Sequence, residues 1–304
     1  MNALATASLA RAWLLVALGF AMFPNVDIWV AQQFYVPALG GFYLDHVKSL
    51  ALLREVIWNL FHLVALVVIL FGLQAWYSNQ KLEIPGRFWA FCASLIVLGP
   101  VLLVNLGFKA HWGRARPAQI DSFGGEAQFT PALQFADECA RNCSFVSGEA
   151  AAATVSAIIA GLVLWNVVPP HRRRPLVVVL ISFVVIGASL RVMKGRHFLS
   201  DVVWAALMMM TLAVWLGRLF RLASALPRVT GQALRNDAGL FWGDIRLCLT
   251  PALRELARLL RGGRRLFALT LGRSLLARPK ERRLALAPST KRRPADVRPT
   301  PGSR

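Results

Sequence analysis

Hydrophobic residues in this chain come in long blocks separated by short polar segments, rather than in the one-sided stripes of soluble amphipathic helices. Six blocks approach the length that an α-helix needs to cross the apolar core of a bilayer. They cover roughly residues 10–26, 57–77, 88–108, 145–168, 176–190 and 202–222. The pattern therefore predicts an all-α fold, a six-span transmembrane helical bundle over residues 1–222, with one large external loop at 109–144.

Composition and charge agree with a membrane protein and add an orientation. Hydrophobic residues make up 56% of the 304 residues and charged residues only 16%, which is too apolar for an ordinary soluble domain. From Gly217 onward lie 20 of the 35 basic residues but only 5 of the 15 acidic ones. Because basic segments stay on the cytoplasmic side, we expect both termini inside and the connections 27–56, 109–144 and 191–201 outside.

The basic tail explains most of the net charge of +20. Residues 223–277 mix Leu, Phe and Trp with Arg at helical spacing, which is typical of amphipathic helices in the membrane interface. Residues 278–304 are rich in Pro, Arg and Lys, and we expect them to be disordered. We predict that the tail binds membrane phospholipids and not nucleic acid. No oligomeric state follows from the sequence.

Two of the four cysteines, Cys139 and Cys143, fall in the predicted outer loop. An oxidising compartment would permit a disulfide there, but spacing alone does not establish its geometry. A metal site is less expected, because no second pair of ligands lies nearby. Disulfide and free thiols both remain open.

The first of three short polar blocks is KAHWGRARP, from Lys109 to Pro117. In a helical stretch, Lys109 and Arg116 are seven residues apart and can point to one side. An ammonium and a planar guanidinium together suit the oxygens of a phosphate group, although basic residues can also simply flank a membrane span. We take His111 and Arg114 of the same block as accessory.

The second block, SFVSGE, places Ser147 and Gly148 at the entry to the fourth hydrophobic block. A small hydroxyl and exposed N–H groups at a helix start form an anion site. A plain helix cap has the same sequence, so both interpretations stay open.

The third block, RVMKGRHFLSD, is the most specific. Arg191 precedes His197 by six residues and Asp201 follows it by four. If a helix begins near His197, then His197 and Asp201 share a face. The carboxylate could accept the Nδ1–H and leave Nε2 to attack phosphorus.

The pattern K-x6-RP, then SG at a span entrance, then R-x5-H-x3-D, resembles the type 2 phosphatidic acid phosphatase superfamily over roughly residues 55–220. The resemblance implies a helical bundle, no metal or other cofactor, and a phosphohistidine intermediate on His197. Asp201 would orient this nucleophile. The phosphate ligands that the resemblance implies are Lys109, Arg116, Arg191, Ser147 and Gly148.

One position departs from the family pattern. The middle motif of the family usually reads P-S-G-H, and its histidine protonates the leaving oxygen, whereas this chain has Val146 and Glu149 at the first and last positions. A glutamate can donate that proton only if burial or a negative neighbour favours its protonated form. Two hypotheses follow: Glu149 is the catalytic acid, or the leaving group needs little protonation, as in diphosphates and sugar 1-phosphates.

The sequence thus predicts a lipid phosphate phosphatase at the outer face of a bacterial inner membrane. Its candidate substrates are polyprenyl diphosphate, lipid A phosphate, phosphatidate and phosphatidylglycerol phosphate. One alternative is a lipid phosphotransferase that uses the same His197. Another, suggested by Glu149, is a catalytically weakened membrane protein that binds phospholipids.

Overall fold

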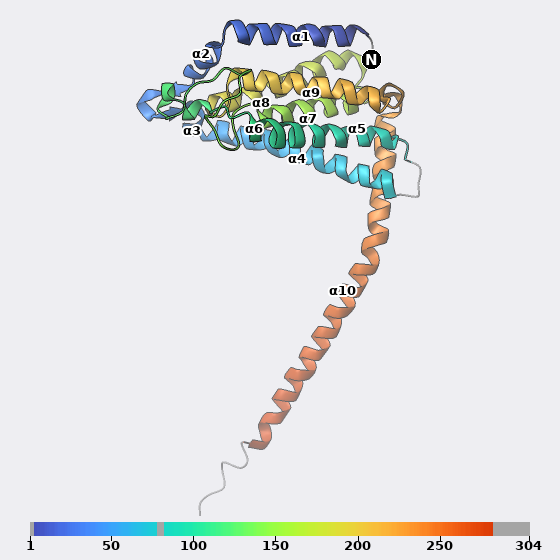
Figure 1. Ribbon diagram of the computed structural model, residues 1–304. Coiled ribbons are helices and arrows are strands. Elements are labelled where there is room, and N and C mark those ends of the chain that lie inside the picture. Colours follow the sequence, from blue (N-terminus) through green and yellow to red (C-terminus); the bar gives the residue numbers. More distant parts are fainter. Residues whose placement is uncertain (1–2, 78–81, 282–304) are drawn as a thin grey trace, which may run out of the picture. The chain divides into compact units, whose positions relative to one another are not determined.

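The computed structural model describes residues 3–77 and 82–281. The chain divides into two units, residues 1–241 and 242–304. The first unit contains a bundle of helices, as the hydrophobic blocks predicted (Figure 1). Its long helices are α1 (Ala3–Met22), α4 (Lys48–Tyr77), α5 (Gly86–Ile96), α7 (Gly148–Leu164), α8 (Arg173–Met193) and α9 (Leu199–Leu219).

The third hydrophobic block forms one continuous helical stretch with a change of winding. After α5 the chain continues as a π-helical segment, η2 (Val97–Phe108), and a last turn, α6 (Lys109–His111). Pro100 lies inside η2 and cannot donate a backbone hydrogen bond. Wide helical turns of this kind are frequent beside functional sites, and this one carries Lys109 at its end.

Helix α7 lies at the centre of the bundle and packs against α4, α5, α8 and α9. Its first turns consist of small buried residues, Gly148 and Ala150–Ala153. Small side chains let neighbouring helices approach closely. The start of α7 therefore lies against the start of α9, where the backbone N–H of Ser147 donates to the carbonyl of Asp201 at 3.1 Å.

The structure does not confirm the predicted six spans. Among the described residues, four helical stretches are long and apolar enough to cross a membrane: 48–77, 86–111, 170–193 and 199–219. The chain bends by 79° between α1 and α2 (Val26–Gln32), next to Pro24, so these two helices form a fifth span only if the bent pair crosses as one. Helix α7 has 17 residues, fewer than a usual span. All six blocks contain helix, but length and composition support four or five spans.

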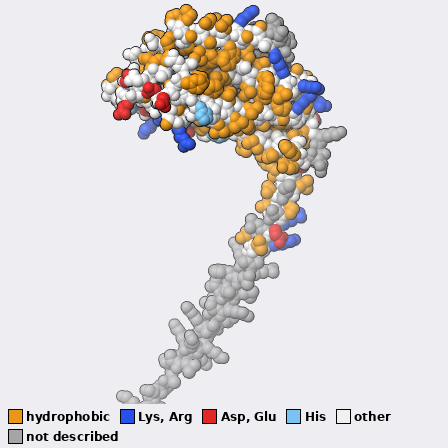
Figure 2. Space-filling view, viewed as in Figure 1, with side chains coloured by type: hydrophobic (Ala, Val, Ile, Leu, Met, Phe, Trp, Pro, Cys, Tyr) orange, Lys and Arg blue, Asp and Glu red, His pale blue; other side chains and the backbone are white. Residues whose placement is uncertain are grey.

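The outer surface of the bundle is apolar. Large hydrophobic side chains on α4 and α8 point away from the core, among them Leu63, Ile69 and Val179, each more than half exposed. Figure 2 shows hydrophobic side chains covering the side of the bundle, with charged side chains gathered toward its ends. An exposed apolar surface that covers the side of a helical bundle is typical of a face that contacts lipid.

Two segments outside the long helices cover one end of the bundle. The first holds α2, a two-stranded hairpin of β1 (Tyr35–Val36) and β2 (Gly41–Phe42), and α3 (Tyr43–His46). The second is the long loop after α6. They share a small core of buried residues: Ala31, Phe42, Ala115, Ile120, Phe123 and Phe198. The short 3-10 turns are η1 (Pro37–Leu39), η3 (Pro117–Gln119), η4 (Asp121–Phe123), η5 (Pro170–Arg172), η6 (Leu222–Ser224) and η7 (Leu226–Arg228).

The last element is α10 (Gly231–Glu281), one helix where the sequence suggested separate amphipathic segments over 223–277. Its first turns belong to the first unit. There the buried carboxylate of Asp237 accepts the backbone N–H groups of Glu83 and Ile84 at 2.9 and 3.0 Å. The predicted disordered segment 278–304 begins inside α10, and its residues 282–304 lie outside the described part of the chain. The position of this helix in a membrane interface stays a prediction.

Candidate active site

All three polar blocks meet at the end of the bundle that the hairpin and the long loop cover. The first block follows α6, the second starts α7, and the third joins α8 to α9. Gly195 makes this last connection tight, because its φ of +60° favours glycine. A side chain at this position would collide with the ring of Phe42. The hairpin therefore fixes the turn that leads into His197.

His197 is buried, with 1% of its surface exposed. Its Nδ1 lies 2.7 Å from the backbone carbonyl oxygen of Ser144. A carbonyl oxygen can only accept, so Nδ1 carries the hydrogen and Nε2 keeps its lone pair. Burial lowers the pKa of His197 from 6.5 to about 4, and the nearby Asp201 only partly opposes this. The imidazole is thus neutral at pH 7, the form that can act as a nucleophile.

The partner of His197 differs from the expected one. Oδ2 of Asp201 lies 3.7 Å from Nδ1 of His197, beyond a good hydrogen bond. The same oxygen accepts the hydroxyl of Ser144 at 2.5 Å and the backbone N–H of Phe198 at 2.9 Å. Because α9 starts only at Leu199, Asp201 caps the helix start, as a carboxylate at the third helical position can. Asp201 therefore fixes the position of Ser144, and the backbone carbonyl of Ser144 in turn binds the His197 ring.

A buried guanidinium, taken as accessory from the sequence, lies behind this segment. Arg114 is fully buried and donates to Asp201 Oδ1 at 2.6 Å and to Asp27 Oδ2 at 2.8 Å. It also donates to the carbonyl of Thr130 at 2.8 Å, and its guanidinium carbon lies 4.3 Å from the centre of the Phe198 ring. Sequence reasoning missed Asp27, although a lone acidic residue in an apolar segment is itself a signal.

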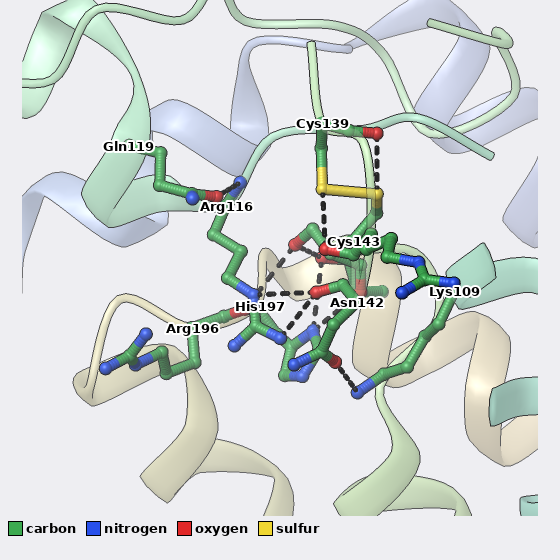
Figure 3. Close-up of a disulfide and its surroundings, with 11 residues drawn as sticks. Lys109, Arg116, Gln119, Cys139, Asn142, Cys143, Arg196 and His197 are labelled. Carbon is green, nitrogen blue, oxygen red and sulfur yellow. Dashed lines mark hydrogen bonds and ion pairs between the residues drawn. A yellow bond between two sulfur atoms is a disulfide. The ribbon is translucent and has the colours of Figure 1, made fainter. Parts of the chain in front are cut away.

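The three predicted phosphate-binding cations surround this site. The Arg116 guanidinium donates to the carbonyl of Asn142 through Nε at 3.2 Å and Nη2 at 2.7 Å. Lys109 Nζ lies 3.4 Å from Oδ1 of the same Asn142. Arg191 is buried, and its Nε has no hydrogen-bond partner in the described part of the chain. An unpaired buried donor such as Nε of Arg191 suits an incoming anion. Figure 3 shows the side chains of Lys109, Arg116 and His197 gathered around Asn142.

The second block supplies a helix start facing these cations. Ser147 caps α7, since its Oγ accepts the backbone N–H of Ala150 at 3.3 Å. Gly148 leaves space: a Cβ there would lie 3.6 Å from Lys109 Nζ and 3.3 Å from Oδ1 of Asn105. The first N–H groups of a helix lack intrahelical partners. The structure thus shows the helix cap, whereas anion binding by this helix start stays a prediction.

Glu149 does not point freely toward a leaving group. Its carboxylate accepts from Nε and Nη2 of Arg54 at 3.0 and 2.7 Å and lies 3.1 Å from Nη1 of Arg191. Both carboxylate oxygens are thus engaged by guanidinium groups, and this geometry opposes the acid hypothesis. Arg54 lies on α4, far from the motifs in sequence, and sequence reasoning missed it.

No group of three His, Cys, Asp or Glu side chains that could hold a metal ion occurs among residues 3–77 and 82–281. The resemblance-based expectation of a metal-free reaction stays a prediction.

Comparison with known proteins gives a family for this arrangement. A model of the PAP2 superfamily matches residues 87–224, which contain all three polar blocks. The lipid A 4′-phosphatase of Rhizobium leguminosarum is 36% identical over 211 residues, which cover 63% of this chain and 85% of the relative. The lipid A 4′-phosphatases of Rhizobium etli and Francisella tularensis subsp. novicida are 34% and 32% identical, over 62% of this chain and 77% and 83% of the relatives.

No solved structure matches this chain significantly. The relatives are bacterial, and together with the apolar helices they indicate a bacterial membrane protein. The residues that the family model matches contain the three polar blocks that meet at the site. The chain belongs to the PAP2 superfamily and is a phosphatase.

Proposed function

We propose that this phosphatase removes the phosphate group of a membrane lipid through a phosphoenzyme on Nε2 of His197. The observation that carries the proposal is a buried neutral imidazole, held at Nδ1 by the carbonyl of Ser144, beside three cations. Holding one ring nitrogen as a donor leaves the other as a nucleophile. We therefore include in the proposal the phosphohistidine intermediate on His197 that the resemblance implies.

The reaction has two steps. Nε2 of His197 forms a bond to phosphorus as the bond from phosphorus to the lipid oxygen breaks, and the lipid oxygen takes a proton from solvent water and leaves as an alcohol. Water then attacks the phosphohistidine, releases inorganic phosphate and restores the imidazole. Lys109, Arg116 and Arg191 stabilise the charge on the phosphoryl oxygens in both steps, and the start of α7 adds N–H donors.

Lipid A 4′-phosphate is the substrate that we propose first, because the relatives named above carry that activity in their names. We place the site at the outer face of the membrane and the basic tail in the cytoplasm, on the distribution of Lys and Arg. Both assignments make the function that we infer from the motifs more specific, because they name a substrate and a side of the membrane.

A panel of purified lipid phosphates tests this function. The full chain in detergent is given lipid A 4′-phosphate, polyprenyl diphosphate, phosphatidate and phosphatidylglycerol phosphate, and released inorganic phosphate is measured. We expect the highest kcat/KM on lipid A phosphate. Transfer of labelled phosphate to a lipid acceptor, without release of inorganic phosphate, would instead identify a phosphotransferase. Binding without turnover of any lipid would identify the phospholipid-binding alternative.

Glu149, in this proposal, positions Arg54 and Arg191 and does not protonate the leaving oxygen. Glu149→Gln keeps an oxygen acceptor for these guanidinium groups, so we expect a loss of about tenfold in kcat/KM, mostly through KM. Loss of a catalytic acid would cost about 10²- to 10⁴-fold in kcat and remove the alkaline limb of its pH profile. Steady-state kinetics over a pH series distinguish the two roles. Glu149→Ala is the variant that removes both the acceptor oxygen and the acidic group.

The low pKa of His197 sets the acid limit of activity. The nucleophile is the neutral imidazole, which is lost as the pH falls through about 4, not through 6.5. We therefore expect kcat at saturating substrate to persist to about pH 5 and to fall below that. A plot of log kcat against pH measures the limit. An acid limb centred near 6.5 would show that the imidazole is far more hydrated than in this structure.

A further inference from the structure

A small closed loop borders the cation cluster. Cys139 and Cys143 form a disulfide with their Cα atoms 5.6 Å apart, within the usual range for such a bridge. The disulfide left open by the sequence is thus present in the structure. Figure 3 shows the bridge directly above Asn142, with Lys109 and Arg116 on either side of this residue. We call residues 139–143 the disulfide loop.

Asn142 contacts both predicted phosphate ligands of the first block. Its backbone carbonyl accepts two N–H groups of Arg116, and its side-chain Oδ1 lies 3.4 Å from Nζ of Lys109. Two cations that share one anion site repel each other before the anion arrives. Oxygen atoms fixed between them compensate for this repulsion and set their spacing.

The conformation of Asn142 is specific and depends on its neighbours. Its φ is +52°, a left-handed value that asparagine adopts more readily than most residues. The next residue also contacts the first block, because the backbone N–H of Cys143 donates to the carbonyl of Lys109 at 3.1 Å. Ser144, which follows, donates its N–H to the carbonyl of Arg114 at 2.9 Å and holds His197. The disulfide loop thus leads directly into the segment that holds the nucleophile.

We propose that the disulfide and Asn142 act as positioning elements that preset the spacing of Lys109 and Arg116 for the phosphate group. This inference rests on the proposed function only in naming phosphate as the anion. Closing a short loop restrains the unfolded chain less than closing a long one, so the bridge acts chiefly on local geometry. The affinity for phosphate therefore depends on an oxidised loop.

The test compares phosphate binding and kinetics in the full-length chain in detergent. Cys139→Ser/Cys143→Ser removes the bridge. Asn142→Gly keeps the bridge, the carbonyl and the left-handed conformation but removes Oδ1, whereas Asn142→Asp restores an oxygen at that position. Inorganic phosphate binding is measured by calorimetry, kcat and KM with a lipid phosphate, and the melting temperature as a check of folding.

We expect the double serine variant and Asn142→Gly each to bind inorganic phosphate about tenfold more weakly and to raise KM by a similar factor, with a smaller change in kcat. Asn142→Asp restores the oxygen but adds a negative charge beside Lys109, so it should bind inorganic phosphate at least as weakly as Asn142→Gly, because the carboxylate repels the anion. Dithiothreitol transfers two electrons and two protons to the bridge and becomes a cyclic disulfide itself. It should weaken the wild type as the serine substitutions do and leave the double serine variant unchanged.

Unchanged phosphate affinity in both the double serine variant and Asn142→Gly would overturn the proposal. If the double serine variant does not fold, Asn142→Gly decides alone, because it retains the bridge. Failure of the wild type to hydrolyse any lipid phosphate would reject the proposed function. The calorimetric comparison would still decide whether the loop positions the two cations.

Discussion

His197→Ala should lower kcat by at least about 10⁴-fold, because no other described side chain in the cluster presents a neutral imidazole to a bound phosphate. Turnover of a lipid phosphate is measured by release of inorganic phosphate. The buried cations stay in place in this variant, so inorganic phosphate should still bind. His171→Ala is the matched control, since His171 lies exposed in η5 at the opposite end of α8, and its kcat should equal that of the wild type.

A trapping experiment sharpens this prediction. Rapid quenching of the wild type with labelled lipid phosphate should give a phosphoprotein that is stable in alkali and labile in acid, as expected for a phosphorylated imidazole. His197→Ala should give none. Retention of a tenth of the wild-type kcat in His197→Ala would show that another group attacks the phosphorus.

Arg114→Met should destabilise the fold by about 3–5 kcal/mol, because it leaves two buried carboxylates without their shared cation. Arg114 is fully buried between Asp27 and Asp201, both also buried. We expect a clearly lower melting temperature in detergent and a poor yield of folded protein. The exposed Arg172→Met is the matched control and should change the melting temperature little.

A second variant separates charge from geometry at this position. Arg114→Lys keeps one positive charge but cannot reach both carboxylates with a planar fork. We expect a loss of stability between those of the wild type and Arg114→Met. If Arg114→Met melts as the wild type does, the buried ion pairs contribute no net stability to the fold.

The local motifs were predictable because each one is tied to a helix end. The position of these blocks at the ends of hydrophobic segments placed Lys109, Arg116, His197 and Asp201 at one end of the bundle, and the structure brings them together there. The predicted helical spacing was wrong for both pairs, because α6 ends at His111 and α9 begins only after His197. The helical blocks followed from hydrophobicity alone. The number of spans did not, since Pro24 bends the first block and Ser147 starts α7 later than the hydrophobic block begins.

Partners that come from distant segments were not predictable. Asp27 and Arg54 contact the motifs only after the bundle has folded, and no local spacing relates them to Arg114 or Glu149. Asp201 was assigned to His197 on helical spacing, yet His197 precedes the helix, so a backbone carbonyl takes that place. A spacing rule applies only to residues that share one regular element.

The bend between α1 and α2 has a practical meaning for fragment design. It brings Asp27 from the first stretch of the chain into the ion pairs behind the nucleophile. The family model begins only at residue 87, so an expressed fragment chosen on that boundary would retain every motif residue and yet lack a counterion for its central arginine. The structural support of the site in this chain thus begins well upstream of the residues that the family model matches.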